Sequence, residues 1–84
     1  MRPDYYKTLV RARVPGHAEF MHVEIECFDL IDALGFGFYL GNALKYLFRV
    51  GRKHPDRNGD LSKVITYCRV VKMRDERAAA EEKR

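Results

Sequence analysis

The stretch at residues 41–53 combines cations, an aromatic ring and an amide at the spacing of one helix face. Positions three and four apart are neighbours on a helix, so such side chains line up in a stripe. Cations bind phosphate, and an aromatic ring can stack on a base. The stripe therefore predicts a site for a nucleotide or another phosphorylated small molecule. Its members are Asn42, Lys45, Tyr46, Arg49 and the adjacent Lys53.

Two residues of a later predicted helix, Lys63 and Tyr67, join this candidate site. We assign four cations to phosphate, namely Lys45, Arg49, Lys53 and Lys63. We assign three residues to stacking or polar contacts with the base, namely Asn42, Tyr46 and Tyr67. A purely structural interpretation stays open, because cations near the C-terminal end of a helix are favoured by its dipole. Ion pairs from Asp29 to Lys45, or from Asp60 to Arg49, would explain much of the same pattern.

A row of carboxylates, Glu26, Asp29 and Asp32, follows helical spacing ahead of this stretch. Magnesium needs only one or two carboxylates when substrate phosphates complete its shell, so these three are the candidate Mg²⁺ ligands. A solvated face, or salt bridges to Lys45 or Lys63, explains the row equally simply. We therefore assign no metal and no cofactor to the chain.

Several classes of chemistry are excluded by the motifs. Gly35 and Gly37 are not followed by the Gly-Lys-Ser/Thr of a phosphate-binding loop, which excludes a P-loop kinase. The three histidines and two cysteines do not follow the spacing of a zinc site. No catalytic residue is assigned, and whether the protein is an enzyme is left undecided.

The elements that must position the site are predicted to be helical. Apolar spacing predicts helices over residues 21–34 and 38–50, and a third that begins with Asp60 as its N-cap. Alternation at residues 8–14 has strand character, and such a strand needs a partner within the chain or from another subunit. The expected fold is all-α: a compact three-helix domain with an extended or short-strand N-terminal arm and a charged C-terminal tail. The expected divisions are residues 1–20 (arm), 21–74 (helical domain) and 75–84 (a helix extension or a disordered tail).

Composition adds expectations about partners and location. The 84 residues allow one domain, and a domain this small buries too little surface to be more than marginally stable. Because 46% of the residues are hydrophobic, apolar surface buried between subunits would add stability. We therefore expect a homo-oligomer. The net charge of +4 favours an anionic partner, although a charge of this size also serves solubility. The sequence contains no membrane span or signal peptide, which predicts a cytoplasmic protein with no membrane partner.

Five separated blocks also resemble a family of small bacteriophage proteins catalogued as domain of unknown function 3310. The blocks are residues 22–29 (HVEIECFD), 35–36 (GF), 40–49 (LGNALKYLFR), 60–64 (DLSKV) and Tyr67. Val64 departs from the alanine that is usual at its position. The resemblance spans residues 22–74. It implies a phage-encoded protein, in the host bacterial cytoplasm, of a family often labelled nucleotide-kinase-like.

Three functions remain in view. The preferred one is binding of a nucleotide or related phosphorylated molecule, in nucleotide metabolism or host takeover. The second is a nucleic-acid-binding module that uses the basic loop at residues 52–57, whose affinity would fall steeply with salt. The third is an inhibitor of a host protein with no small ligand.

Overall fold

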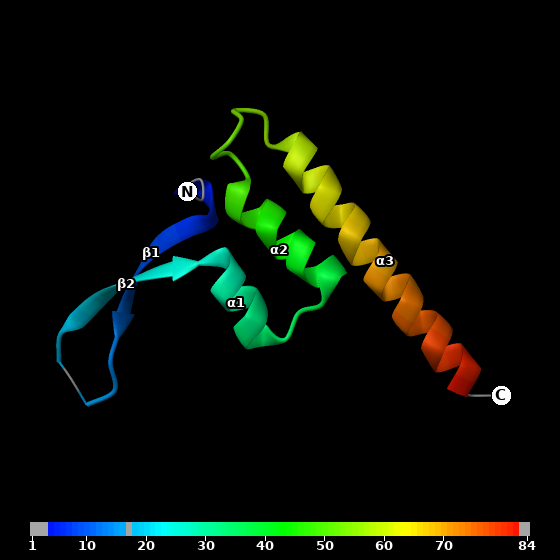
Figure 1. Ribbon diagram of the computed structural model, residues 1–84, viewed down its shortest axis with the longest axis horizontal. Helices are drawn as coiled ribbons and strands as arrows, with labels where there is room; N and C mark the ends of the chain where they lie inside the picture. The colour runs from blue at the N-terminus through cyan, green and yellow to red at the C-terminus, as the bar shows by residue number, and fades with distance from the viewer. Residues whose placement is uncertain (1–3, 17, 83–84) are drawn as a thin grey trace.

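The computed structural model describes residues 4–16 and 18–82 as an α+β fold, with a β-hairpin followed by three helices (Figure 1). The expectation of an all-α fold is therefore wrong, because two strands form an antiparallel sheet. The elements are η1 (Asp4–Tyr6), β1 (Lys7–Arg13), β2 (Phe20–Glu26), α1 (Cys27–Leu34), α2 (Phe38–Arg49) and α3 (Asn58–Glu82).

The sheet pairs β1 with β2 in one antiparallel register, from Lys7 opposite Glu26 to Arg13 opposite Phe20. The strand character predicted for the N-terminal arm is confirmed, and its partner lies in the same chain. The hairpin projects away from the helices (Figure 1). A two-stranded hairpin has little stability by itself, so the stability of this one depends on contacts between its base and the rest of the fold.

The helix expected from Met21 does not form at that point. Met21, Val23 and Ile25 alternate with polar residues, and β-branched side chains at alternate positions suit a strand. The helical spacing that joins Val23 to Cys27 is coincidental, because Val23 lies in β2 and Cys27 begins α1. Strand pairing across the hairpin therefore overrides the local periodicity.

Helix α1 ends at Gly35, as predicted, in the left-handed conformation (φ 67°). The Gly35 and Phe36 N–H groups donate to carbonyls of the last turn, at 3.1 Å each. Helix α2 follows and lies between α1 and α3 (Figure 1). Its predicted extent, residues 38–50, agrees with the structure to within one residue. The close approach of α1 and α2 occurs at Gly41, where an added Cβ would lie 3.1 Å from Ile31 Cγ2.

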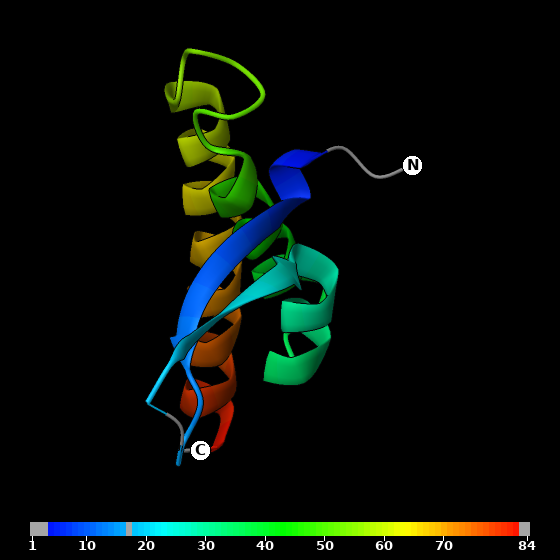
Figure 2. The same cartoon turned by 90° about the vertical axis from the view of Figure 1, so that its left-hand side faces the viewer.

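Helix α3 begins at Asn58, two residues before the predicted N-cap. Asp56 provides the hydrogen-bond acceptor at the start of the helix instead: its Oδ1 accepts the Asn58 N–H at 3.0 Å. Asp60 turns inward and is buried. Residues 75–82 of the expected tail continue α3, which is one uninterrupted helix (Figure 2). The last two residues of that tail, residues 83–84, and the first three of the arm lie outside the described part.

The buried core is small. Only Tyr6, Cys27 and Ala43 are buried hydrophobic residues among those described, and the chain exposes 6745 Å² of surface. Large apolar side chains remain exposed on every main element. These are Leu9, Phe20, Met21, Val23, Leu34, Phe38, Leu47, Ile65 and Met73. Of the helices described, none has the length and apolar content needed to cross a membrane.

Candidate functional site

Three cations surround the ring of Tyr46 on α2. Lys63 Nζ lies 4.8 Å from the ring centre, Arg49 Cζ 5.0 Å and Lys45 Nζ 5.7 Å. The face of a tyrosine ring attracts cations through its quadrupole, so Tyr46 gathers charges from α2 and α3 at one point. We call Lys45, Tyr46, Arg49, Lys63 and Tyr67 the basic-aromatic cluster. It contains five of the seven residues predicted to bind the ligand.

Tyr67 belongs to the cluster because it stacks on Tyr46. The ring centres are 5.9 Å apart and the planes differ by 13°. Tyr39 lies at the other side, 6.3 Å from Tyr67, with Arg74 above it at 4.6 Å. The two tyrosines predicted to stack on a base therefore stack on each other and join α2 to α3. A ligand base would have to meet them at an edge or displace one ring.

Arg49 is the buried member of the cluster. Its Nε lies 3.1 Å from Asp60 Oδ1, and its Nη1 donates to the Tyr6 hydroxyl at 3.3 Å. Burial alone would lower the pKa of Arg49, but the bond to Tyr6 and the charge of Asp60 outweigh it, so the pKa is raised. The predicted Asp60–Arg49 ion pair is confirmed. Arg49 thus holds α2, α3 and η1 together, and its charge is balanced within the fold.

The charges of Lys45 and Lys63 are not balanced in this way. Neither forms an ion pair with any residue in the described ranges, 4–16 and 18–82, so the Asp29–Lys45 pair is absent there. Lys45 is half-buried and Lys63 is exposed. Because the charges of Arg49 and Asp60 cancel, the cluster keeps the two positive charges of Lys45 and Lys63 beside the electron-rich ring of Tyr46.

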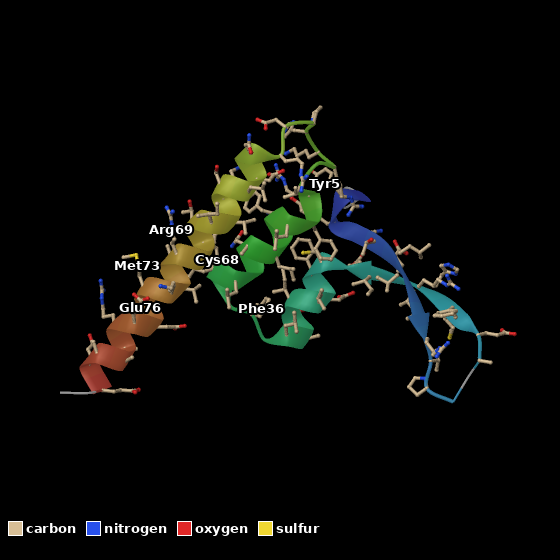
Figure 3. The ribbon with its side chains drawn as sticks, turned by 180° about the vertical axis from the view of Figure 1, so that it is seen from behind. Tyr5, Phe36, Cys68, Arg69, Met73 and Glu76 are labelled. Carbon is tan, nitrogen blue, oxygen red and sulfur yellow. The ribbon has the colours of Figure 1, made fainter. Side chains whose placement is uncertain are left out.

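Lys53 and Asn42, the other two predicted residues, lie outside the cluster. Lys53 is exposed in the loop after α2, and its Nζ lies 5.9 Å from the ring centre of Tyr5. Tyr5 itself lies beside the C-terminal end of α2 (Figure 3). Asn42 Nδ2 donates to the Phe38 carbonyl at 2.7 Å, one turn back along α2.

Two hollows open next to the cluster, one at Lys63 and one at Lys45. The first, of about 330 Å³, lies where the loop after α2 leads into α3. It is lined by Arg49, His54, Pro55, Asp56, Gly59, Asp60 and Lys63. The second, of about 380 Å³, lies between α1 and α2 and is more aromatic. It is lined by Phe28, Ile31, Phe36, Gly37, Phe38, Gly41, Asn42 and Lys45.

The hollow at Lys63 contains an unusual carboxylate. Asp60 is 4% exposed, and its Oδ2 has no hydrogen-bond partner among the described residues. Next to Arg49 this oxygen is electrostatically compensated even without a direct bond. Its negative charge disfavours a phosphate placed directly at the N-terminus of α3, so an anion is better accommodated nearer Lys63.

Burial also affects Cys27, the first residue of α1. Removal from water raises the pKa of the Cys27 thiol, and the positive charge of Lys45 partly opposes the rise. Cys27 is fully buried, and both cysteines are free thiols. Cys27 is therefore a core residue, and the charge of Lys45 influences the pKa of its thiol.

The carboxylate row does not gather into a metal centre. Glu26 ends β2 and lies 3.7 Å from Lys7 Nζ, while Asp29 and Asp32 are exposed on α1. Among the residues described, no three His, Cys, Asp or Glu side chains come together as a metal site. Helical spacing placed Glu26 in the row, but Glu26 belongs to the sheet.

Sequence reasoning missed the contribution of η1. Tyr6 is 8% exposed, packs edge-to-face with Phe28 at a centroid distance of 5.8 Å, and accepts a hydrogen bond from Arg49, 43 residues away in the sequence. Lys45 Nζ also lies 5.7 Å from its ring centre. The only signal was the adjacent pair of tyrosines before a strand, and nothing local indicates which helix they meet.

Comparison with known proteins identifies a family but no characterised relative. The profile of the family described as a protein of unknown function (DUF3310) matches residues 14–69, which include every residue of the basic-aromatic cluster. No curated protein matches the chain. No solved structure matches it either.

Proposed function

The chain belongs to the DUF3310 family, and we propose that it binds a nucleotide or a related phosphorylated small molecule at the basic-aromatic cluster. The observation that carries the proposal is the pair of unbalanced lysines, Lys45 and Lys63, which converge on Tyr46 at 5.7 Å and 4.8 Å. Two cations beside one ring and without ion-pair partners repel each other, and an anion between them reduces that cost. Phosphate is the anion that this spacing and the adjoining hollows suit.

The phosphate groups lie between the two lysines in this proposal. Arg49 adds its positive charge to the site but keeps its ion pair with Asp60 and its hydrogen bond to Tyr6, because breaking a buried pair leaves an unbalanced charge. Lys53, on the exposed loop, assists only a longer polyphosphate. Lys45 and Lys63 are therefore the residues on which affinity depends most.

The base occupies the hollow between α1 and α2. Ligand pockets combine apolar walls with a few polar groups that fix orientation, and this hollow offers phenylalanines together with Asn42 and Lys45. The Asn42 amide already donates to the Phe38 carbonyl, which holds it in one orientation. Its Oδ1 then faces a base edge as an acceptor.

We also propose the biological setting that the resemblance to small phage proteins suggests. The protein is phage-encoded and acts in the cytoplasm of the infected bacterium, in nucleotide metabolism or host takeover. We assign no reaction, because no residue of the cluster has the arrangement of a nucleophile and its base.

The test is a thermal-shift and calorimetric screen against nucleoside mono-, di- and triphosphates, with and without Mg²⁺. A ligand at 100 times its dissociation constant adds about 2.7 kcal/mol to the free energy of unfolding. We expect Lys45→Ala and Lys63→Ala each to weaken the best ligand by about tenfold or more. Neither lysine forms an ion pair with described residues, so both variants should fold as well as the wild type.

The matched control is Lys72→Ala, which removes an α3 lysine that pairs with Glu76 at 2.7 Å and does not contact the cluster. It should bind the ligand as the wild type does. A screen with no shift for any nucleotide contradicts the proposal. Tight binding of oligonucleotides alone, weakening steeply with salt, would instead support a nucleic-acid-binding module.

A further inference from the structure

The molecule has an apolar face that its own elements leave open. Residues of α2 and α3 at spacings of three, four and seven line one side of the α2–α3 pair. We call this the apolar hairpin face. It consists of Leu40, Leu44, Leu47, Leu61, Val64, Ile65 and Cys68.

The other sides of α2 are occupied, and the outer side of α3 is mostly polar. On α2, Gly41 faces Ile31 of α1, Tyr46 meets Tyr67 of α3, and Arg49 meets Tyr6 of η1. On α3, Arg69, Met73 and Glu76 lie along the side turned away from α2 (Figure 3). The apolar hairpin face is what remains, and it lies opposite the side of α2 that contacts η1. Leu47 and Ile65 are each 50% exposed there.

The exposed area is too large for a folded monomer of this mass. A chain of 9.9 kDa is expected to expose about 5,200 Å², whereas this one exposes 6745 Å². The excess, about 1,500 Å², comes partly from the projecting β-hairpin, and it is large enough to include the 800 Å² or so that each partner buries in a standard interface. The principal extents of 54 × 37 × 21 Å agree with a flat slab that lacks a second layer.

Charge along α3 indicates what covers the face. The loop before α3 has three bases and one acid (Arg52, Lys53, Arg57 and Asp56), so its end is basic. From Asp75 to Glu82 the helix has four acids and one base, so this segment of α3 is acidic, although Lys83 and Arg84 follow it in the sequence. Leu61, Cys68, Asp75 and Glu82 are spaced by sevens and so share a side of α3. Each α2–α3 pair is thus complementary to a second copy that runs antiparallel to it.

We propose that the apolar hairpin face is the interface of an antiparallel, two-fold homodimer. The two α2–α3 pairs form a four-helix bundle, and the basic loop of each copy meets the acidic segment of α3 in the other. In a two-fold interface the same patch serves both subunits, which this charge pattern allows. The basic-aromatic cluster stays at the edge of the bundle, accessible to its ligand.

The first test is the mass in solution, by sedimentation over a range of concentrations. We expect twice the chain mass for the wild type. Leu47→Asp and Ile65→Asp should raise the dimer dissociation constant at least about tenfold, because each buries a charge in the interface. Both side chains are half-exposed in the monomer, so circular dichroism should show retained helix.

The matched control is Leu9→Asp, on β1, where the side chain is 64% exposed. It should leave the dimer intact. A wild-type monomer at every concentration would overturn the proposal. So would a dimer that Leu9→Asp dissociates and Leu47→Asp does not, since that result would place the interface on the β-hairpin.

A charge exchange tests the antiparallel arrangement separately. Arg57→Glu and Glu82→Lys should each weaken the dimer, and the double variant should recover most of the affinity. A parallel arrangement would bring like ends together, and the double variant would then be no tighter than either single one. That outcome would overturn the orientation.

Discussion

Arg49 shows how one residue of a predicted binding stripe also serves the fold. Its neighbours in the basic-aromatic cluster, Lys45 and Lys63, are unbalanced, whereas Arg49 is 8% exposed, forms an ion pair with Asp60 and donates a hydrogen bond to Tyr6. A guanidinium suits this position because its several N–H groups can face an ion-pair partner and a hydrogen-bond acceptor in different directions at once. Lysine, with a single charged atom, would satisfy one partner and leave the other unpaired.

The first prediction concerns this pair. Arg49→Met leaves Asp60 charged and buried, and should lower the free energy of unfolding by about 3–5 kcal/mol. Replacing both, as Arg49→Met with Asp60→Leu, removes the charge and its partner together. The double variant should recover much of the loss, which urea unfolding would measure. If the double variant is less stable than Arg49→Met, the pair is not the reason for the destabilisation.

At the scale of elements, the contact between α1 and α2 depends on a residue without a side chain. Gly41 is buried in the first half of α2 and faces Ile31. Glycine disfavours helix by about 1 kcal/mol relative to alanine, so its presence there indicates that close packing outweighs helix propensity. The hollow lined by Asn42 and Lys45 opens beside this contact.

The second prediction is therefore that Gly41→Leu separates α1 from α2. Overpacking at such a site costs roughly 1–3 kcal/mol, and the adjoining hollow should change shape, so nucleotide binding should weaken as well. Gly59→Ala is the control, because an added Cβ there meets nothing within 4 Å. It should be neutral or stabilising, by up to about 1 kcal/mol. A Gly41→Leu protein as stable as the wild type would contradict close packing of the two helices.

How far the sequence predicts these elements depends on the range of the interactions. Helix α2, the first strand and the Arg49–Asp60 pair follow from local pattern and charge, and all three are present. The sequence predicts helix where β2 lies, because Val23 and Cys27 are four residues apart, as on one face of a helix. The alternation within residues 20–26 fits a strand as well, and only pairing with β1 decides between helix and strand. The Tyr6–Arg49 bond joins residues 43 apart, which no local pattern encodes.

For the whole molecule, the small core and the open face raise the question of what stabilises the fold. Three buried hydrophobic residues among those described are few for a chain of 84. Small domains that cannot build a sufficient core usually add cross-links, metals or a partner subunit. The two cysteines are free thiols, and the homodimer proposed above would supply such a partner subunit.

The third prediction follows from coupling between folding and association. If dimerisation supplies much of the stability, the unfolding midpoint must rise with protein concentration, because dilution favours dissociation by mass action. A hundredfold increase in concentration should raise the midpoint by several degrees in the wild type, measured by calorimetry. In Ile65→Asp the dependence should largely disappear, and the midpoint should fall to that of the dilute wild type. A midpoint that is independent of concentration would mean that the single chain is stable with its apolar face exposed, and the excess surface would then require another partner.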